Sequence, residues 1–424
     1  MVEITPEGSG YKVEWSDLGL TAMVRHIKDR PAQFKAQVAI SHQGYPVHRS
    51  NPVLDSTSGM DALVRKLNKR RDGADYGIAW DQVVEDLSGI VIDTHRRGVS
   101  ELVISDVPVN DSVNWRVDNI LIEGNAAPNL IWADGGTGKS MFALWLSVLI
   151  QTGHASTDHG LVVEPGNVLY LDWETDQYEV ANRTQKIHKG LGIAAPSGIV
   201  YRYMGLPLVD DVDRVRDIMH RRDIDVVIID SMGLAVSGEM ESAETVLSFF
   251  RAIRLLGKTT LIVSHANRQG TIFGSAYTIN ASRSVWEAKK SAGNSGGIDF
   301  GLFHRKANNI PIQSAQSWSV DFRDDAVIYT RGDVFKTDNA GTLSYGDLIY
   351  KILQTDGPKT KEYLEDTIKG MKGDPVERVK SNVATAISRH KRNGKVAETG
   401  DGMVSLVPAG APQAPQEGEG EWTI

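Results

Sequence analysis

The sequence predicts an α/β protein with a mainly parallel central sheet. Five apolar runs lack polar alternation, as expected for strands buried on both faces; they span residues 129–133, 168–172, 199–203, 226–230 and 259–264. Stretches with helical periodicity separate them, which is typical of parallel strands joined by crossover helices. Three later runs, residues 298–304, 317–322 and 327–329, suit antiparallel strands at one edge of the same sheet.

The 424 residues divide into four parts, because a chain of this length exceeds one compact domain. Residues 1–108 combine alternating stretches with two helices, near 60–71 and 80–97, and predict an α+β domain of unknown role. The parallel-sheet unit spans 113–335. Three helices and a hairpin follow at 342–408, and the acidic tail 409–424 has the composition of a disordered segment.

The composition indicates an ordinary globular protein. Hydrophobic residues make up 41% and charged residues 24% of the chain. The net charge of −8 excludes a protein that coats a polyanion through positive charge over its whole surface. The chain has no cysteine, which excludes disulfides, thiolate catalysis and cysteine-bound zinc. We find no signal peptide and no apolar run of membrane-spanning length, and we expect a cytoplasmic protein without a membrane partner.

A glycine-rich loop between the first buried strand and an apolar helix is the strongest chemical signal. Its glycines let backbone N–H groups turn towards phosphate oxygens, and the helix N-terminus adds a favourable field. Lys139 is placed to reach the β- and γ-phosphates, and the Ser140 hydroxyl to bind Mg²⁺. Ala133 replaces the first glycine of the usual pattern. The predicted ATP site comprises Ala133, Asp134, Gly135, Gly136, Thr137, Gly138, Lys139, Ser140 and Met141.

Two carboxylates belong with this loop. Asp230 ends a buried strand, where a Walker B aspartate holds Mg²⁺. Glu174 lies just beyond the strand at 168–172, at the edge where ligands of parallel sheets bind, and is a candidate general base for the attacking water. Asp172 and Asp176 compete with it for that role.

With these residues in place, residues 113–309 resemble the RecA-like ATPases of the hexameric plasmid RepA and replicative DnaB helicase type. The resemblance lies in the lead-in to the loop at 113–124, in 170–174 and in 228–231. It implies a RecA-like core, Glu174 as the catalytic glutamate and Asp230 as the Walker B residue. The N-terminal region does not match the helicase N-terminal domain, so hydrolysis is better supported than unwinding.

The resemblance extends to the strand and loop that follow Walker B. Residues 260–267 look like the sensor strand, which makes His265 the sensor candidate, with a structural histidine as the alternative. Residues 274–276 and 281–286 resemble the helix after the mobile DNA-facing loop. The loop 267–271 is therefore the candidate contact with single-stranded DNA, unless it is a plain surface loop.

Residues 303–309 correspond to the place where the family carries basic fingers. Such fingers reach the neighbouring subunit's γ-phosphate, and Arg305 and Lys306 are the candidates. Side chains alternate along a strand, so only one of the two can point in the required direction. A finger acting in trans requires a homo-oligomer, for which the family implies a hexamer.

The C-terminal unit has the helix and hairpin order of a winged helix. Between positions 378 and 395 it carries six basic residues and no acidic one: Arg378, Lys380, Arg389, Lys391, Arg392 and Lys395. This bias favours contact with phosphates, although many winged helices bind protein instead.

These observations predict an ATP-dependent DNA motor, a helicase or translocase that uses Mg²⁺ in replication or recombination. A phage or mobile-element replication protein would suit the chain. The alternatives are a RecA-like recombinase or regulatory ATPase that hydrolyses ATP without unwinding, and a nucleotide-switched DNA-binding adaptor or helicase loader.

Overall fold

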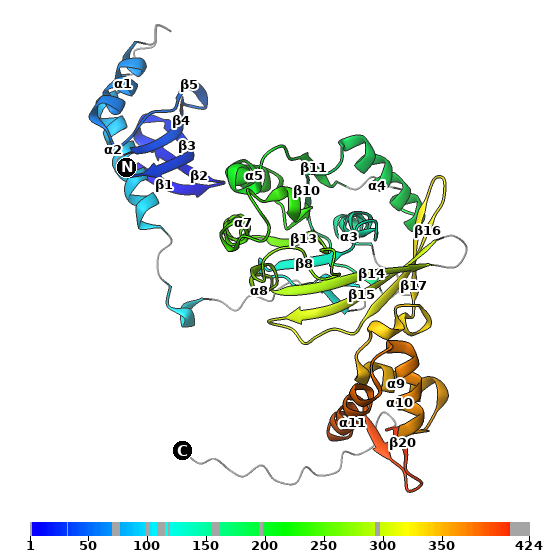
Figure 1. Cartoon of the computed structure of the whole chain (residues 1–424). Helices are drawn as coiled ribbons and strands as arrows, with labels where there is room; N and C mark the ends of the chain where they lie inside the picture. The colour runs from blue at the N-terminus through cyan, green and yellow to red at the C-terminus, as the bar shows by residue number, and fades with distance from the viewer. Residues whose placement is uncertain are drawn as a thin grey trace, which may run out of the picture.

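The structure is a computed structural model that describes most of the chain. The described residues are 2–31, 33–69, 77–98, 102–107, 115–117, 119–154, 161–194, 198–292 and 297–407, and the acidic tail lies outside them. Three units follow one another in space, with the α/β core between an N-terminal and a C-terminal unit (Figure 1). In the part of the chain so described, no helix is long and apolar enough to cross a bilayer.

A nine-stranded sheet forms the centre of the core, in the order β11-β10-β12-β13-β8-β14-β15-β16-β17. Its first five strands are parallel, as predicted; four of them are buried, whereas the edge strand β11 is only partly buried. They are β8 (Pro128–Ala133), β10 (Val168–Asp172), β11 (Val200–Tyr203), β12 (Val226–Asp230) and β13 (Thr259–His265). This order puts β13 between the loop-bearing strand β8 and β12, the strand that ends at Asp230.

The other half of the sheet corrects one prediction. The helix expected over 281–286 ends early: α8 covers Tyr277–Ala281, and β14 (Ser284–Ala292) then runs parallel to β8. Trp286 is fully buried in β14 and stacks on His304 at a centroid distance of 4.3 Å, so core packing selects the strand. Antiparallel strands complete the sheet: β15 (Ile298–Ala307), β16 (Gln316–Phe322) and β17 (Val327–Gly332).

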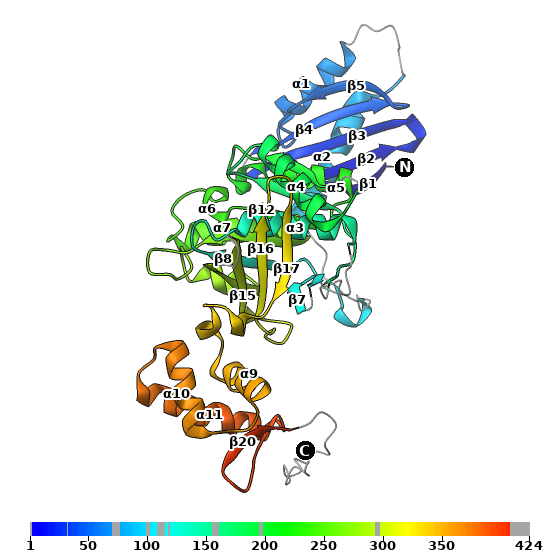
Figure 2. The ribbon, with the colours of Figure 1, turned by 90° about the vertical axis from the view of Figure 1, so that its right-hand side faces the viewer.

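Helices cover both faces of this sheet (Figure 2). On one face α3 (Lys139–Thr152) and α4 (Gln177–Leu191) enclose an apolar cluster in which Trp145 stacks on Tyr329 at 4.6 Å. The other face carries α5 (Leu208–Arg222), α6 (Met232–Ala235) and α7 (Ala243–Leu256) over a second cluster. The sheet is thus buried on both sides, which explains the unalternating strands.

The N-terminal unit is an antiparallel sheet of five strands in sequence order, backed by two helices. Apolar side chains alternate along the strands and pack against α1 (Thr57–Asn68) and α2 (Trp80–Arg97). The Ser9 hydroxyl donates to Asp217 Oδ1 of α5 at 3.0 Å, which ties this unit to the core. The strands are β1 (Val2–Glu7), β2 (Gly10–Trp15), β3 (Leu20–Arg30), β4 (Gln33–His42) and β5 (Tyr45–Ser50).

Between this unit and the core runs a connection with little regular structure. It includes a short 3-10 turn at Ile104–Asp106. A small antiparallel sheet combines two strands that precede β8, β6 (Trp115–Val117) and β7 (Asn119–Ile122), with β9 (Leu161–Val162), which follows α3.

The C-terminal unit contains three helices and a three-stranded sheet in the order β18-β20-β19. A short strand that the sequence did not indicate, β18 (Lys359–Thr360), pairs with β20 before the second helix begins. Phe303 of β15 belongs to the same apolar cluster as the helices of this unit. The remaining elements are α9 (Tyr345–Asp356), α10 (Lys361–Lys372), α11 (Val376–Arg392), β19 (Val396–Glu398) and β20 (Met403–Leu406).

Candidate functional site

The glycine-rich loop, Glu174, Asp230 and His265 come together at one edge of the core sheet. The loop follows β8, and the three side chains stand at or just beyond the ends of β10, β12 and β13. These four strands are parallel, so their carboxyl ends share one edge, where open α/β sheets bind ligands.

The loop is folded tightly around its lysine. Gly136 and Gly138 have φ values of 67° and 94°, a region that favours glycine, and α3 begins directly after Gly138. The Thr137 hydroxyl donates to Asp134 O at 2.7 Å. Lys139 is 5% exposed, and its Nζ donates to Ala133 O at 3.0 Å and to Asp134 O at 2.8 Å. The loop therefore holds an ammonium group at the start of α3, next to its free backbone N–H groups.

The other members of the predicted loop take different positions. Asp134 and Gly135 are exposed, whereas Ala133 is buried at the end of β8. Met141 faces inwards and packs against the apolar cluster under the sheet. The side chain of Met141 thus holds α3 against this cluster. Only the backbone N–H group of Met141 is left to face a phosphate.

Ser140 and Asp230 form the pair that fits a divalent cation. The Ser140 hydroxyl lies 3.2 Å from Asp230 Oδ1, and Tyr170 donates to Asp230 Oδ2 at 2.6 Å. Burial raises the pKa of Asp230 to about 6, while the hydrogen bonds from Tyr170 and Ser140 act in the opposite direction. One hydroxyl and one carboxylate suit Mg²⁺, which keeps several waters and takes the rest of its ligands from substrate phosphates.

Glu174 lies close to this pair, and two hydrogen bonds hold its carboxylate. Ser231, the residue after Asp230, donates to Glu174 Oε1, and His265 Nε2 lies 3.3 Å from the same oxygen. The bond with His265 is the main cause that lowers the pKa of Glu174, and burial opposes it. An ionised carboxylate at this edge is able to accept a proton from water.

The structure separates Glu174 from its two competitors. Asp172 is 1% exposed, and its Oδ1 accepts hydrogen bonds from the backbone N–H groups of Glu174 and Thr175, at 2.9 and 3.1 Å. Asp176 caps α4 by accepting from Tyr178 N and Glu179 N. Both aspartates therefore hold backbone turns, and Asp172 holds the turn that presents Glu174.

Burial and the neighbouring carboxylates act in opposite directions on the pKa of Lys139. Burial lowers its pKa, and the charges of Asp230, Glu174 and Asp134 raise it in turn. The site thus gathers one buried cation and several carboxylates at a single edge, a pattern that is typical of functional sites.

Arg305 and Lys306 lie elsewhere on the core. Arg305 Nε donates to Glu287 Oε2 of β14 at 2.7 Å. Lys306 Nζ donates to the backbone carbonyls of Ile279, Asn280 and Ser282, at 2.6 to 3.0 Å. Within the described part of the chain, neither side chain forms a hydrogen bond or ion pair with the glycine-rich loop.

Sequence reasoning missed two side chains at the site. Tyr170 contacts Asp230 as described, and Lys290 of β14 donates from Nζ to Gly136 O at 2.8 Å. Tyr170 lies two residues before Asp172 on the same face of β10, so its position was available from strand alternation. Lys290 carried no comparable signal, because β14 itself was not predicted.

The loop after β13 is well ordered by its own side chains. Asn267 Oδ1 accepts from Gln269 N at 2.9 Å and from Thr271 N at 3.1 Å, and Phe273 N donates to His265 O at 2.9 Å. The candidate DNA-facing loop therefore returns directly to the residue that contacts Glu174.

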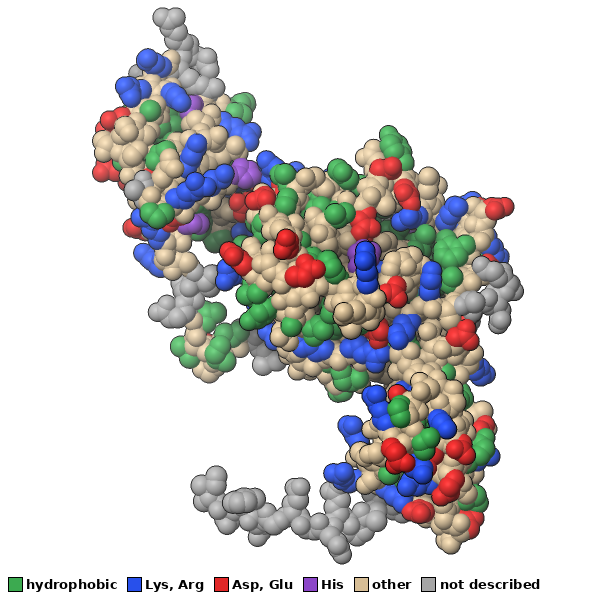
Figure 3. Space-filling view, in the orientation of Figure 1, with side chains coloured by type: hydrophobic (Ala, Val, Ile, Leu, Met, Phe, Trp, Pro, Cys, Tyr) green, Lys and Arg blue, Asp and Glu red, His purple; other side chains and the backbone are tan. Residues whose placement is uncertain are grey.

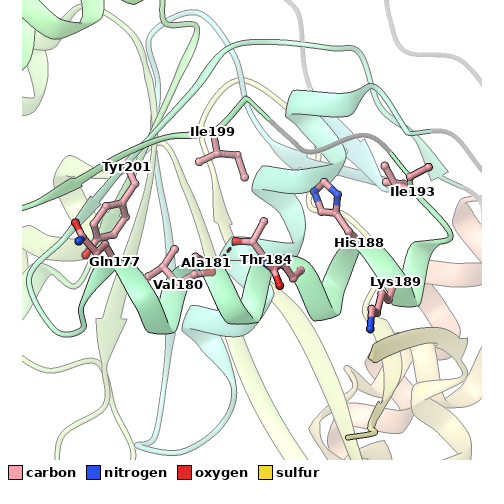
Figure 4. A pocket seen from close by; sticks show the side chains of 11 residues that line it. Gln177, Val180, Ala181, Thr184, His188, Lys189, Ile193, Ile199 and Tyr201 are labelled. Carbon is pink, nitrogen blue, oxygen red and sulfur yellow. Dashed lines mark hydrogen bonds between the residues drawn. The ribbon is translucent and has the colours of Figure 1, made fainter. Parts of the chain in front are cut away.

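A separate cavity of about 510 Å³ runs along α4, between the helix and the segment that leads into β11. Figure 4 shows Val180, Ala181, Thr184 and His188 on the helix side and Ile199 and Tyr201 opposite them. None of the predicted site residues lines this cavity, which is distinct from the glycine-rich loop.

Together, the strand order and the site define the class: the core is an α/β fold with a mainly parallel sheet and a P-loop at the carboxyl ends of its strands. Residues 99–271 match the family model described as AAA domain. A KaiC-like protein from the hyperthermophilic archaeon Pyrococcus horikoshii OT3 is one of the similar solved structures. It has 14% sequence identity, covers 48% of this chain and 89% of its own, and gives a TM-score of 0.36. No curated protein matches the chain.

Proposed function

We propose that this chain is an ATP-driven DNA motor, a translocase or helicase. One observation carries the proposal: His265 joins the candidate general base Glu174, 3.3 Å away, to the exposed loop that follows β13. A change at the γ-phosphate that moves Glu174 would therefore be felt first at His265 and then at the loop 267–271. A motor needs such a connection between hydrolysis and its track.

Basic side chains supply a surface for the phosphates of DNA. Lys372 lies near Lys289, Arg305 and Arg378, whose charges lower its pKa together with burial, the larger cause, while Asp374 opposes them. Figure 3 shows Lys and Arg side chains on the rim of the core and on the adjoining side of the C-terminal unit. Binding through this surface would depend strongly on salt, since each neutralised phosphate releases counterions.

The C-terminal unit supports the same reading. Its order of helix, strand, two helices and hairpin supports the proposed winged helix, in which α11 would take the recognition position. The last turn of α11 is basic, with Arg389, His390, Lys391 and Arg392. We propose that this unit adds a second contact to DNA.

The proposed active form is a ring, most simply a hexamer, in which a basic side chain completes the neighbour's site. Arg305 suits this role better than Lys306, because its side chain is 41% exposed and has one carboxylate partner to leave. Lys306 is held by three carbonyl oxygens, and its pKa is lowered by burial.

Steady-state ATP hydrolysis with and without single-stranded DNA tests the proposal. We expect DNA to stimulate turnover of the intact chain, and Glu174→Gln to lower it by about 10²- to 10⁴-fold while ATP binding is kept. Lys139→Ala should weaken binding itself. Turnover that is absent, or that ignores DNA, contradicts the motor.

Two alternatives remain distinguishable by assay. A recombinase or regulatory ATPase would show DNA-stimulated turnover without strand displacement on a forked duplex. An adaptor or helicase loader would bind ATP tightly with negligible turnover in the presence of DNA.

A further inference from the structure

We propose that Tyr170 is a positioning residue that fixes the Asp230 carboxylate so that one chosen oxygen faces the metal of Mg²⁺·ATP. The inference rests on the proposed ATP hydrolysis at this site and concerns how the chain prepares it.

The register of the sheet brings Tyr170 and Asp230 together. Asp172 of β10 lies opposite Asp230 of β12, and Tyr170 lies two residues earlier on the same face. The two side chains are therefore diagonal neighbours, a separation that a tyrosine spans. Tyr170 is 2% exposed, and its ring belongs to the apolar cluster beneath α3.

Because Tyr170 bonds to only one oxygen of the Asp230 carboxylate, the two oxygens have different partners. It donates to Asp230 Oδ2 at 2.6 Å, while Oδ1 lies 3.2 Å from the Ser140 hydroxyl. A carboxylate rotates easily about its last torsion and would otherwise offer either oxygen. With Oδ2 engaged, Oδ1 is the atom left to share the cation with Ser140.

Tyr170 is suited to this task because it remains a donor. Its hydroxyl donates to Asp230 Oδ2 in the folded structure, and a tyrosine hydroxyl is an ordinary hydrogen-bond donor at neutral pH. The tightly packed ring fixes the hydroxyl in place, so the bond costs little additional ordering.

The distinguishing variant is Tyr170→Phe, which removes one hydroxyl and keeps the packed ring. Tyr329→Phe is the matched control, since Tyr329 is a buried tyrosine of the same apolar cluster with its ring stacked on Trp145. Binding of a fluorescent ATP analogue is measured by anisotropy over a Mg²⁺ titration, and thermal unfolding is followed in parallel.

We expect Tyr170→Phe to raise the Mg²⁺ concentration for half-maximal binding by about tenfold or more, the scale of one hydrogen bond to a charged group. Binding without Mg²⁺ should match that of the wild type, and the Tyr329→Phe titration should be unchanged. At saturating Mg²⁺ we expect a lower kcat with little change in KM.

Two results overturn the inference. One is a Tyr170→Phe titration that coincides with the wild type. The other is a loss of binding that is equal with and without Mg²⁺, which indicates a packing defect. Mg²⁺-dependent ATP turnover of the wild type is measured separately, and its absence would contradict the proposed hydrolysis itself, so the two failures are distinguishable.

Discussion

Replacing Asp230 by asparagine should stabilise the core while abolishing Mg²⁺-dependent turnover. Asp230 is 3% exposed, and burial raises its pKa from 3.8 to about 6. At about 1.36 kcal/mol for each pKa unit, ionised Asp230 costs the folded state about 3 kcal/mol at pH 8. Asparagine has a similar shape and no charge, so Asp230→Asn removes this cost.

The stability difference between Asp230→Asn and the wild type should depend on pH. The folded protein holds the Asp230 proton more tightly than the unfolded chain, so the stability due to the protonated form is complete below about pH 3.8. That stability is lost as the pH rises through 6. The advantage of Asp230→Asn should therefore be largest near pH 8 and shrink as the pH falls from 6 towards 4.

Urea unfolding in EDTA without nucleotide, followed by tryptophan fluorescence, measures the difference at pH 8 and pH 4.5. Trp145 and Trp286 are buried in the core and report on its unfolding. Equal stability of both proteins at pH 8, or an advantage that does not vary with pH, would refute the reasoning.

Two further predictions concern packing. Asn129 is fully buried, and its side chain bonds to Glu123 N and to the carbonyls of Glu123, Ala127 and Thr260. Asn129→Ala should therefore lower the free energy of unfolding by about 1–3 kcal/mol. Urea unfolding of the variant that matches the wild type would contradict this. At Gly190 of α4 an added Cβ would lie 1.9 Å from Val327 O, so Gly190→Ala should lower the melting temperature. Gly370→Ala in α10 is the control, because a Cβ there meets nothing within 4 Å and should stabilise that helix slightly.

The buried strands and the phosphate loop could be predicted because their signals are local. An apolar run without alternation identifies a strand covered on both faces, and glycines before Lys139 identify the turn. Strand β14 was not predicted because the charged residues Glu287, Lys289 and Lys290 interrupt its apolar run, although Glu287 is buried in the folded sheet. The partner that pairs with Glu287, Arg305, comes from another strand.

The roles of the carboxylates at the end of β10 could likewise not be assigned from the sequence alone. Asp172 and Glu174 are two residues apart, and composition does not distinguish a base from a cap. The distinction arises because Asp172 is buried and folds back on the N–H groups that follow it, whereas Glu174 meets Ser231 and His265 from two other strands. Such contacts depend on sheet register, which a single sequence does not specify.

Sharing Phe303 between β15 and the C-terminal cluster has a mechanical consequence. Lys372 of α10 adds hydrogen bonds to Gly341 O and Leu343 O, at 2.9 and 2.7 Å, so the connecting segment is itself pinned. The C-terminal unit is therefore joined to the sheet by side-chain packing as well as by the connecting chain. A change in the tilt of β15 would therefore be passed to the C-terminal unit through Phe303 rather than absorbed by a free linker.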